Sequence, residues 1–414
     1  MPAPATVQEF IALLRQSRLL DEETVDRFVQ QRRTAIATNQ VTMAQLAGLL
    51  VRDGLLTHFQ AESILHGRWR RFNIGRYRVL DQLGTGGMGS VLLCEHTHMR
   101  RKVAVKILPI AQTANSSSLE RFYREARAVA VLNHPNVVRA YDVGQDDSLH
   151  FFAMEYVEGS TLHDIVRKTG LLSPLQAVHY LRQAAAGLHH IHQNNLVHRD
   201  IKPANLLVDL TGTVKILDLG LARFHLDNND DLTIRQNELV LGTVDFLSPE
   251  QGINSHEADI RSDIYSLGAT IYFCLTGSPP LGHGSMAQKL LWLQTRDPQP
   301  ITELRPDVPP SLAALLDKMM ARLPEDRFQS PQALQRAVES LPLLTGETAT
   351  SCGDATLTKP DQWGRKPSDV YRWLRVGAGV ALVFLIAGWM MLVAASANKQ
   401  RAPEPNPPAT VPKP

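Results

Sequence analysis

The chain has 414 residues, with 43 Lys and Arg against 41 Asp and Glu, so its formal net charge is only +2. This balance gives no support to a nucleic-acid-binding protein, which normally carries a strong excess or a continuous stripe of basic residues. Hydrophobic residues make up 44% and charged residues 20% of the chain, as is typical of globular proteins. The three cysteines, Cys94, Cys274 and Cys352, include no CxxC pair, so neither a disulfide framework nor a zinc site is expected.

Residues 1–72 are predicted to form a small helical region. Thr42 with Gln45 and Thr57 with Gln60 each match a capping box, in which the hydroxyl accepts from a backbone N–H and the glutamine reaches back. Hydrophobic residues recur with helical spacing along the region: Phe10, Leu13, Leu14, Val25, Phe28, Val29, Leu46, Leu49 and Leu50. Nothing in this pattern indicates catalysis, so we expect a helical bundle or docking module.

Beyond the helical region the periodicity changes to that of β-strands. Three short runs rich in Val and Leu, separated by turn residues, predict strands at 77–83, 90–95 and 102–108. After about Leu162 helical patterns dominate. The predicted fold is therefore α+β, with a β-rich N-lobe followed by a helical C-lobe, in a domain spanning 77–341.

The C-terminal part of the chain predicts a membrane anchor. Residues 342–373 are polar, as expected of a linker, whereas residues 376–397 carry no charge. At a rise of about 1.5 Å per residue this stretch can cross a hydrocarbon core of about 30 Å, so we expect a transmembrane helix at 374–397. A buried helix of a soluble domain is less favoured, because such a helix normally keeps a polar face. More basic residues precede the span than follow it, which places the proline-rich tail 398–414 outside the cell.

The glycine-rich segment 84–89, GTGGMG, is the first motif with a chemical meaning. A GxGxxG pattern alone is weak, because it also marks dinucleotide-binding folds. Those folds need the glycines to open a helix, whereas a strand is predicted at 90–95. A strand–turn–strand hairpin can lay its backbone amides over phosphate groups. The context therefore favours a phosphate-binding hairpin, and an ordinary glycine-rich hairpin is the alternative.

Two further segments carry charged residues among hydrophobic strands. Lys106 ends the run VAVK, where a lysine is costly to bury unless it is paired, and Glu125 on the following helix is the expected partner. The segment HRDIKPAN (198–205), followed by Asp218, gathers two carboxylates, an amide and a lysine within 21 residues.

Phosphoryl transfer requires these groups: oxygen ligands for Mg²⁺, a carboxylate that orients the attacking hydroxyl, and a cation that offsets developing negative charge. Strands predicted at 195–197, 206–208 and 214–217 bound the segment. A solvated loop of charges is the alternative, but it does not explain why the charges lie between hydrophobic strands.

Taken in order, the motifs resemble those of the eukaryotic-type protein kinase family. The set comprises GTGGMGSV at 84–91, VAVK at 103–106, the helix residue Glu125, HRDIKPAN at 198–205, DLG at 218–220 and SPE at 248–250, with Asp263 and Arg327 beyond them. The resemblance covers about 265 residues and implies a bilobal kinase fold. Lys202 within HRDIKPAN resembles the serine/threonine class, and Thr243 fits the place where that class contacts the catalytic segment.

The resemblance implies roles for individual residues. The ATP-binding positions are Leu83, Gly84, Thr85, Gly86, Gly87, Met88, Gly89, Ser90, Val91, Ala104, Lys106, Glu125, Glu155, Val157 and Leu207, with Met154 as gatekeeper. Asp200 is implied as the catalytic carboxylate that accepts the proton of the substrate hydroxyl, and Lys202 as the cation beside the transferred phosphoryl group. Asn205 and Asp218 are implied as ligands of Mg²⁺, with Mn²⁺ as the alternative ion.

Further expectations concern structure and regulation. Asp263 is expected to brace the catalytic segment, and Glu250 to form a buried ion pair with Arg327. Leu219 stands where the family usually has Phe, a change that should alter packing of the inactive state without abolishing activity.

Thr233 is the candidate autophosphorylation site. It is the one hydroxyl residue between Asp218 and Gly242, and Arg199 beside the catalytic Asp200 could pair with its phosphate. A loop that needs no phosphate is the alternative.

The expected activity is transfer of the γ-phosphate of ATP to serine and threonine hydroxyls of protein substrates. The arrangement is similar to that of bacterial membrane-anchored kinases, so the expected location is a bacterial inner membrane, with the kinase domain in the cytoplasm. A homodimer that phosphorylates in trans is expected, with Gly377 and Ala381 as a small-residue helix contact, and no nucleic-acid partner is expected.

Two alternatives remain open. A pseudokinase scaffold uses the same fold for binding, but such proteins usually lack a catalytic residue, and Lys106, Asp200, Asn205 and Asp218 are all present. The other alternative makes residues 1–72 the main functional part, through which partners are recruited.

Overall fold

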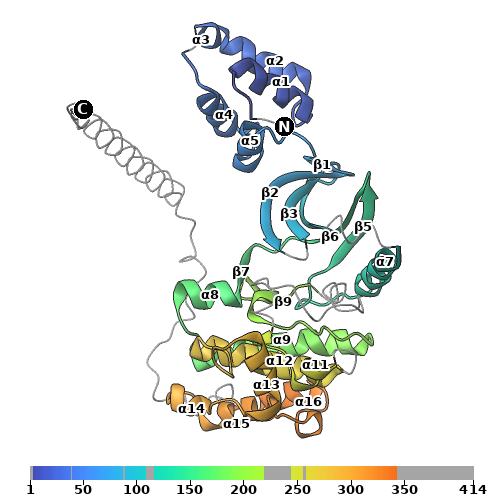
Figure 1. Ribbon diagram of the computed structural model, residues 1–414, viewed down its shortest axis with the longest axis vertical. Helices are drawn as coiled ribbons and strands as arrows, with labels where there is room; N and C mark the ends of the chain where they lie inside the picture. The colour runs from blue at the N-terminus through green and yellow to red at the C-terminus, as the bar shows by residue number, and fades with distance from the viewer. Residues whose placement is uncertain are drawn as a thin grey trace, which may run out of the picture. The chain divides into compact units, whose positions relative to one another are not determined.

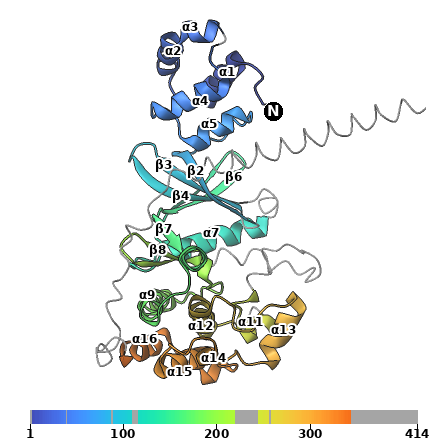
Figure 2. The ribbon, with the colours of Figure 1, turned by 90° about the vertical axis from the view of Figure 1, so that its left-hand side faces the viewer.

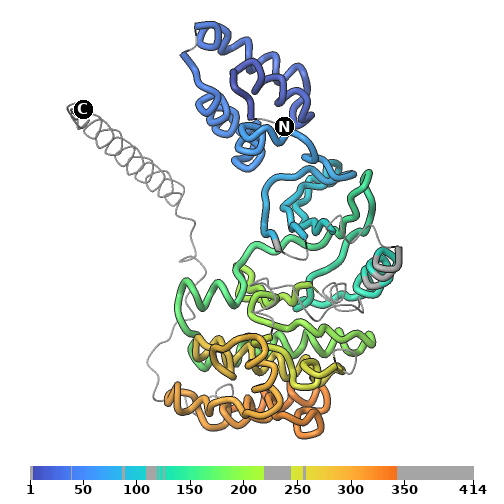
Figure 3. Tube along the Cα trace, viewed as in Figure 1, coloured from blue at the N-terminus to red at the C-terminus, as the bar shows by residue number. Residues whose placement is uncertain are grey.

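The computed structural model describes residues 3–38, 40–86, 89–108, 116–218, 244–254 and 258–342. All of them belong to the first of the chain's two compact units, residues 1–355. Within them, the predicted succession of a helical region, a β-rich lobe and a helical lobe is confirmed, and the chain can be followed through it in Figures 1 and 3.

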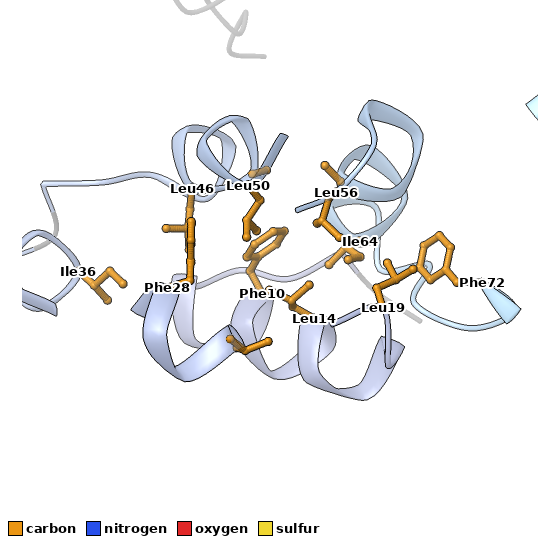
Figure 4. Packing of buried hydrophobic residues seen from close by; sticks show 13 residues of the cluster. Phe10, Leu14, Leu19, Phe28, Ile36, Leu46, Leu50, Leu56, Ile64 and Phe72 are labelled. Carbon is orange, nitrogen blue, oxygen red and sulfur yellow. The ribbon is translucent and has the colours of Figure 1, made fainter. Parts of the chain in front are cut away.

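Five helices form the N-terminal region: α1 (Val7–Ser17), α2 (Glu22–Gln31), α3 (Arg33–Ala37), α4 (Met43–Arg52) and α5 (His58–Leu65). Both predicted capping boxes are confirmed, at the starts of α4 and α5. The helices enclose a hydrophobic core of their own, in which Phe10, Leu46 and Leu50 are fully buried (Figure 4).

The β-rich lobe is one antiparallel sheet with strand order β1-β2-β3-β4-β6-β5. Its strands are β1 (Asn73–Ile74), β2 (Tyr77–Gly86), β3 (Gly89–His96), β4 (Arg101–Ile107), β5 (Ala140–Asp146) and β6 (Leu149–Glu155). Helix α7 (Ser116–Ala130) packs beside β5 (Figure 1). Hydrophobic side chains on one face form the core of the lobe, including Val79, Cys94, Val105 and Ala153.

The C-lobe consists of helices and a three-stranded sheet, β7 (Gly159–Thr161), β8 (Leu206–Asp209) and β9 (Val214–Ile216). Its helices are α8 (Leu162–Thr169), α9 (Pro174–Gln193), α11 (Pro249–Ile253), α12 (Ile260–Thr276), α13 (Met286–Thr295), α14 (Ile301–Leu304), α15 (Pro310–Met319) and α16 (Pro331–Glu339). The described residues of the lobe also include two 3₁₀ turns, η1 (Pro203–Asn205) and η4 (Pro324–Asp326). In both views the small sheet lies at the end of the C-lobe nearest the N-lobe (Figures 1 and 2).

Helix α9 supports the small sheet from below. A capping box at Ser173 with Gln176, and a proline at the first helical position, fix its start. Hydrophobic residues at helical spacing, including Leu181 and Leu188, are fully buried. Helix α9 contacts β9, α12 and α16, so the strands that carry the charged segment rest on a packed core.

One predicted strand is wrong. The segment 195–197 pairs with no other strand in the described structure, because Asn195 has a left-handed backbone (φ 58°) that turns the chain immediately after α9. The strands predicted near 206–208 and 214–217 are present as β8 and β9.

Several expectations lie outside the described residues: the linker 342–373 beyond its first residue, the transmembrane helix 374–397, the tail 398–414 and Thr233. Among the described residues, no helix is both long enough and apolar enough to span a bilayer. Cys94 and Cys274 are free and both buried, and Cys352 lies outside the described residues.

Candidate active site

The segment 198–205 is held at its start by Asp263, a fully buried carboxylate on α12. The backbone N–H groups of His198 and Arg199 donate to the two oxygens of Asp263, at 2.8 and 2.7 Å. Arg199 has φ 65°, a conformation that costs free energy for a residue with a side chain. Asp263 fixes this strained turn by accepting both N–H groups.

Three functional side chains follow directly from this turn. Lys202 Nζ lies 2.9 Å from Asp200 Oδ2, and Asn205 Nδ2 donates to the same oxygen at 3.0 Å. Asn205 Nδ2 also donates to the backbone carbonyl of Asp200 at 2.8 Å. Asp200 and Asn205 are both buried, so their relative positions are fixed by packing as well as by hydrogen bonds.

Lys106, on the central strand β4, meets Asp218, which follows β9. Lys106 Nζ donates to Asp218 Oδ1 at 2.8 Å, and the lysine is only 6% exposed. Burial alone would raise the pKa of the Asp218 carboxyl, but the charge and hydrogen bond of Lys106, with smaller contributions from His198 and Lys202, lower it. Asp218 is therefore an anion held beside a buried cation.

Leu217, the residue before Asp218, connects the Lys106–Asp218 pair to the segment 198–205. Leu217 N donates to the carbonyl of Asn205 at 2.9 Å, and the ring of His198 donates from Nε2 to the carbonyl of Leu217 at 2.7 Å. Nδ1 of the same ring accepts from the backbone N–H of Asp200 at 3.2 Å. Hydrogen bonds thus connect Lys106, Asp200, Asn205 and Asp218 in one cluster, although Lys106 is widely separated from the other three in the sequence.

The glycine-rich hairpin is formed by β2 and β3. Its paired positions are Gly84 with Val91, Thr85 with Ser90, and Gly86 with Gly89. Gly89 has φ 108°, which favours glycine there, while Gly87 and Met88 lie outside the described residues. Val91 is in turn paired with Lys106, so the hairpin and the buried lysine belong to neighbouring strands.

Several of the expected ATP-binding positions, and the expected gatekeeper Met154, lie on neighbouring elements. Ala104 on β4 is paired with Met154 on β6, and both are buried. Leu83 on β2 is 46% exposed, and Leu207 lies on β8. Val157 follows β6 directly in the segment that leads to the C-lobe.

Three residues near the site were missed by the sequence analysis. Lys215 on β9 binds both carboxylate oxygens of Glu155, at 2.8 and 3.0 Å. His192 on α9 bonds to Asp263 Oδ2 at 2.8 Å, and Gln251 on α11 donates to the backbone carbonyl of Arg199 at 3.0 Å. None of them belongs to a motif with its partner, so no signal in the sequence marked these contacts.

Some expected contacts lie outside the described residues. Glu125 lies on α7, but its side chain is outside the described part, so its pairing with Lys106 stays a prediction. The same holds for Leu219, Thr233 and Thr243.

The predicted ion pair between Glu250 and Arg327 is confirmed. Two N–H groups of Arg327 donate to the two oxygens of Glu250, each at 2.8 Å. The arginine side chain is fully buried and also donates to the carbonyls of Ala321, Arg322 and Arg261. The pair links α11 to the end of the C-lobe.

Residues 77–338 match the family model described as protein kinase domain. The chain belongs to this family. Serine/threonine-protein kinase PknB of Mycobacterium leprae is 39% identical over 259 residues, which cover 62% of this chain and 41% of that protein. Serine/threonine-protein kinase PrkC of Bacillus subtilis is 37% identical over 267 residues, which cover 64% of this chain and 40% of that protein. The kinase domain is thus of the serine/threonine class.

A solved structure gives the same result for the fold. The crystal structure of the Mycobacterium tuberculosis PknI kinase domain has a TM-score of 0.51 and 26% identity, and the match covers 64% of this chain and 96% of that one. The chain spans less than half the length of the two curated relatives named above. The predicted bilobal kinase fold is confirmed.

Proposed function

We propose that this chain transfers the γ-phosphate of ATP to serine and threonine hydroxyls of protein substrates. The convergence of Lys106, Asp200, Asn205 and Asp218 carries the proposal. Lys106 Nζ lies 2.8 Å from Asp218, and Asn205 Nδ2 lies 3.0 Å from Asp200. A pseudokinase scaffold would have no need of this bonded cluster.

The residues fit a divalent cation with a nucleotide. The lowered pKa of Asp218 keeps an oxygen anion at the site, because Lys106 outweighs the effect of burial. In the described part of the chain, both hydrogen bonds of the Asn205 side chain are made by its nitrogen, which leaves its oxygen as a ligand. Carboxylate and amide oxygens suit Mg²⁺, or Mn²⁺ in its place. When bound, the ion neutralises phosphate charge and orients the phosphates.

The chain's own residues then handle the substrate. Within the described residues, Lys202 and Asn205 both bind Asp200 through Oδ2, so Oδ1 is the oxygen left to orient the hydroxyl and hold its proton. Lys202 places a positive charge beside that carboxylate, where negative charge develops on the transferred group. Lys106 is positioned to hold phosphate oxygens while keeping Asp218 ionised.

Incorporation of labelled γ-phosphate into a protein substrate tests the proposal. The wild-type chain should transfer phosphate, and Asp200→Asn should lower kcat by at least about a hundredfold, the usual contribution of a general base. Mg·ATP titrated into both proteins in a calorimeter should give similar heats. Wild-type turnover by Asp200→Asn would exclude the assigned role, and a wild-type chain that gives no heat would exclude a kinase.

The proposal extends to regulation and location. Thr233, the one hydroxyl residue between Asp218 and Gly242, is proposed as the autophosphorylation site, phosphorylated in trans within a homodimer. The uncharged stretch 376–397, with more basic residues before it than after it, supports an inner-membrane anchor that leaves the kinase domain in the cytoplasm. Mass spectrometry of active protein that finds Thr233 unmodified would exclude Thr233 as the autophosphorylation site. Membrane fractionation of the full chain beside a chain ending before residue 374 tests the membrane anchor.

A further inference from the structure

The two residues of the capping box at the start of α5 also donate hydrogen bonds to β2 of the β-rich lobe. Within the box, Thr57 N donates to Gln60 Oε1 at 2.9 Å, and Gln60 N donates to Thr57 Oγ1 at 3.2 Å. The two side chains also donate outward, Thr57 Oγ1 to the carbonyl of Leu80 and Gln60 Nε2 to that of Val79, both at 2.6 Å. Gln60 is only 3% exposed, so its amide is committed to these partners.

The two carbonyls lie at a bulge in β2. The register passes from Val79 opposite Cys94 to Asp81 opposite Leu93, so Leu80 is an extra residue in the strand. A bulge leaves part of the ladder unpaired and bends the strand that contains it. The side chains of Thr57 and Gln60 therefore bond to backbone carbonyls at this bulge.

Further contacts fix this junction. The backbone N–H of Val79 donates to the carbonyl of Phe72 at 2.8 Å, so the chain after α5 also bonds to the bulge. Phe59 packs against the core of the helical region and against the core of the β-rich lobe. The N-terminal helices are therefore built onto β2 through polar and hydrophobic contacts.

Strand β2 leads directly from the bulge into the glycine-rich hairpin. Gly84 and Gly86 follow on the same strand, and a second register shift lies between Gln82 and Gly84. Because a bulge sets the direction of the strand beyond it, whatever fixes the carbonyls of Val79 and Leu80 also aims the glycines. Thr57 lies outside the stretch 77–338 that matches the kinase family, so this support belongs to the chain's own helical region.

We propose that Thr57 and Gln60 are positioning residues for nucleotide binding, which act through β2 without touching the nucleotide. The inference rests on the proposed function, because it assigns the glycine-rich hairpin to ATP. It makes the N-terminal helices a working part of the nucleotide site, in addition to any partner that they recruit.

The variant Gln60→Glu separates the two hydrogen bonds of this side chain, one within the capping box and one to the carbonyl of Val79. Glutamate keeps an oxygen for Thr57 N, as capping boxes allow, but replaces the Nε2 donor by an oxygen facing the carbonyl of Val79. Gln45→Glu is the matched control, because Gln45 completes the same kind of box at Thr42 on α4 and is exposed. Thr57→Val and Thr57→Ser form a second pair, since serine keeps the hydroxyl and valine removes it.

Steady-state kinetics with the full chain test the positioning role of Thr57 and Gln60. Gln60→Glu and Thr57→Val should each raise KM for ATP by about three- to tenfold, the effect of one net hydrogen bond, with KM for the protein substrate unchanged. Gln45→Glu and Thr57→Ser should match the wild type. Calorimetric titration with Mg·ATP should show the same loss of affinity.

The possible outcomes distinguish the positioning role of Thr57 and Gln60 from the proposed kinase function. Unchanged ATP affinity in both Gln60→Glu and Thr57→Val overturns the positioning role. A fall in kcat without a change in KM for ATP also overturns it, because a merely structural loss reduces the fraction of active enzyme and not its affinity. A wild-type chain that binds no Mg·ATP refutes the kinase proposal instead.

Discussion

Arg327 is a charged residue whose side chain is fully buried, and it satisfies Glu250 and three backbone carbonyls at once. Removing one member of such a pair leaves the other charge buried and unpaired. We therefore expect Arg327→Met to lower the free energy of unfolding by about 3–5 kcal/mol, measured by denaturant titration. The double variant Glu250→Gln with Arg327→Met should recover part of this loss, and no recovery would argue against the ion pair as the cause.

The same pair should give stability a specific dependence on pH. Burial would raise the pKa of Glu250, but the hydrogen bonds and charge of Arg327 lower it below the ordinary value of 4.5. A carboxyl with a depressed folded-state pKa contributes its full stabilisation above the unfolded pKa and loses it as pH falls through the folded pKa. The free energy of unfolding should therefore fall more steeply below about pH 4.5 in the wild type than in Glu250→Gln. Parallel curves for the two proteins would contradict this.

At the scale of elements, the short segment before β5 ties α9 to β9 and to the N-lobe. Asn136 donates from Nδ2 to the carbonyl of Val214 at 2.8 Å, and its own carbonyl accepts from Ile216 N at 2.9 Å. Helix α9 approaches this junction through Gly187, where a Cβ would lie 2.7 Å from Ile216 Cδ1 and 2.9 Å from the Asn136 carbonyl. The glycine is there because no side chain fits.

Substituting Gly187 by alanine should therefore push α9 away from β9. We expect Gly187→Ala to lower the free energy of unfolding by about 1–3 kcal/mol, as overpacking does, although alanine is the better helix former. Gly48→Ala on α4 is the matched control, since nothing lies within 4 Å of a Cβ there, and it should stabilise by roughly 1 kcal/mol. Thermal unfolding of the two variants checks the opposite signs, and stabilisation by both would exclude the close approach.

The elements also show where sequence reasoning succeeds and where it stops. The capping boxes and the strands around Lys106 are local patterns, so periodicity and cap residues predict them. The strand expected at 195–197 is absent because Asn195 takes a left-handed backbone just after α9, which periodicity does not reveal.

Contacts between distant side chains are harder to predict. The contact of Lys106 with Asp218 was not predicted from the sequence, whereas the expected pairing of Lys106 with Glu125 stays a prediction. Lys215 on β9 and Glu155 on β6 are separated by 60 residues in the sequence, yet their side chains meet in the fold. The motif residues, and Asp263 that braces their segment, could be placed in one site from the family resemblance, but supporting residues such as His192 and Lys215 could not.

For the whole molecule, the question is whether the N-terminal helices are separable from the kinase domain. A recruiting module on a tether could be deleted without effect on the domain. Here Phe59 contributes to the core of the β-rich lobe, and the carbonyls of Val79 and Leu80 depend on Thr57 and Gln60. Deletion of residues 1–72 would expose that hydrophobic surface and leave both carbonyls without their partners.

The shortened chain should therefore be less stable than the full one. Buried aromatic surface and unsatisfied carbonyls contribute about 1–3 kcal/mol each, so the thermal midpoint should fall on the order of 5–10 °C. Differential scanning calorimetry of the full chain beside the shortened chain measures this difference, and saturating Mg·ATP should narrow it if the shortened chain still binds nucleotide. An unchanged midpoint would mean that the helices do not support the lobe, and would favour a role confined to recruiting partners.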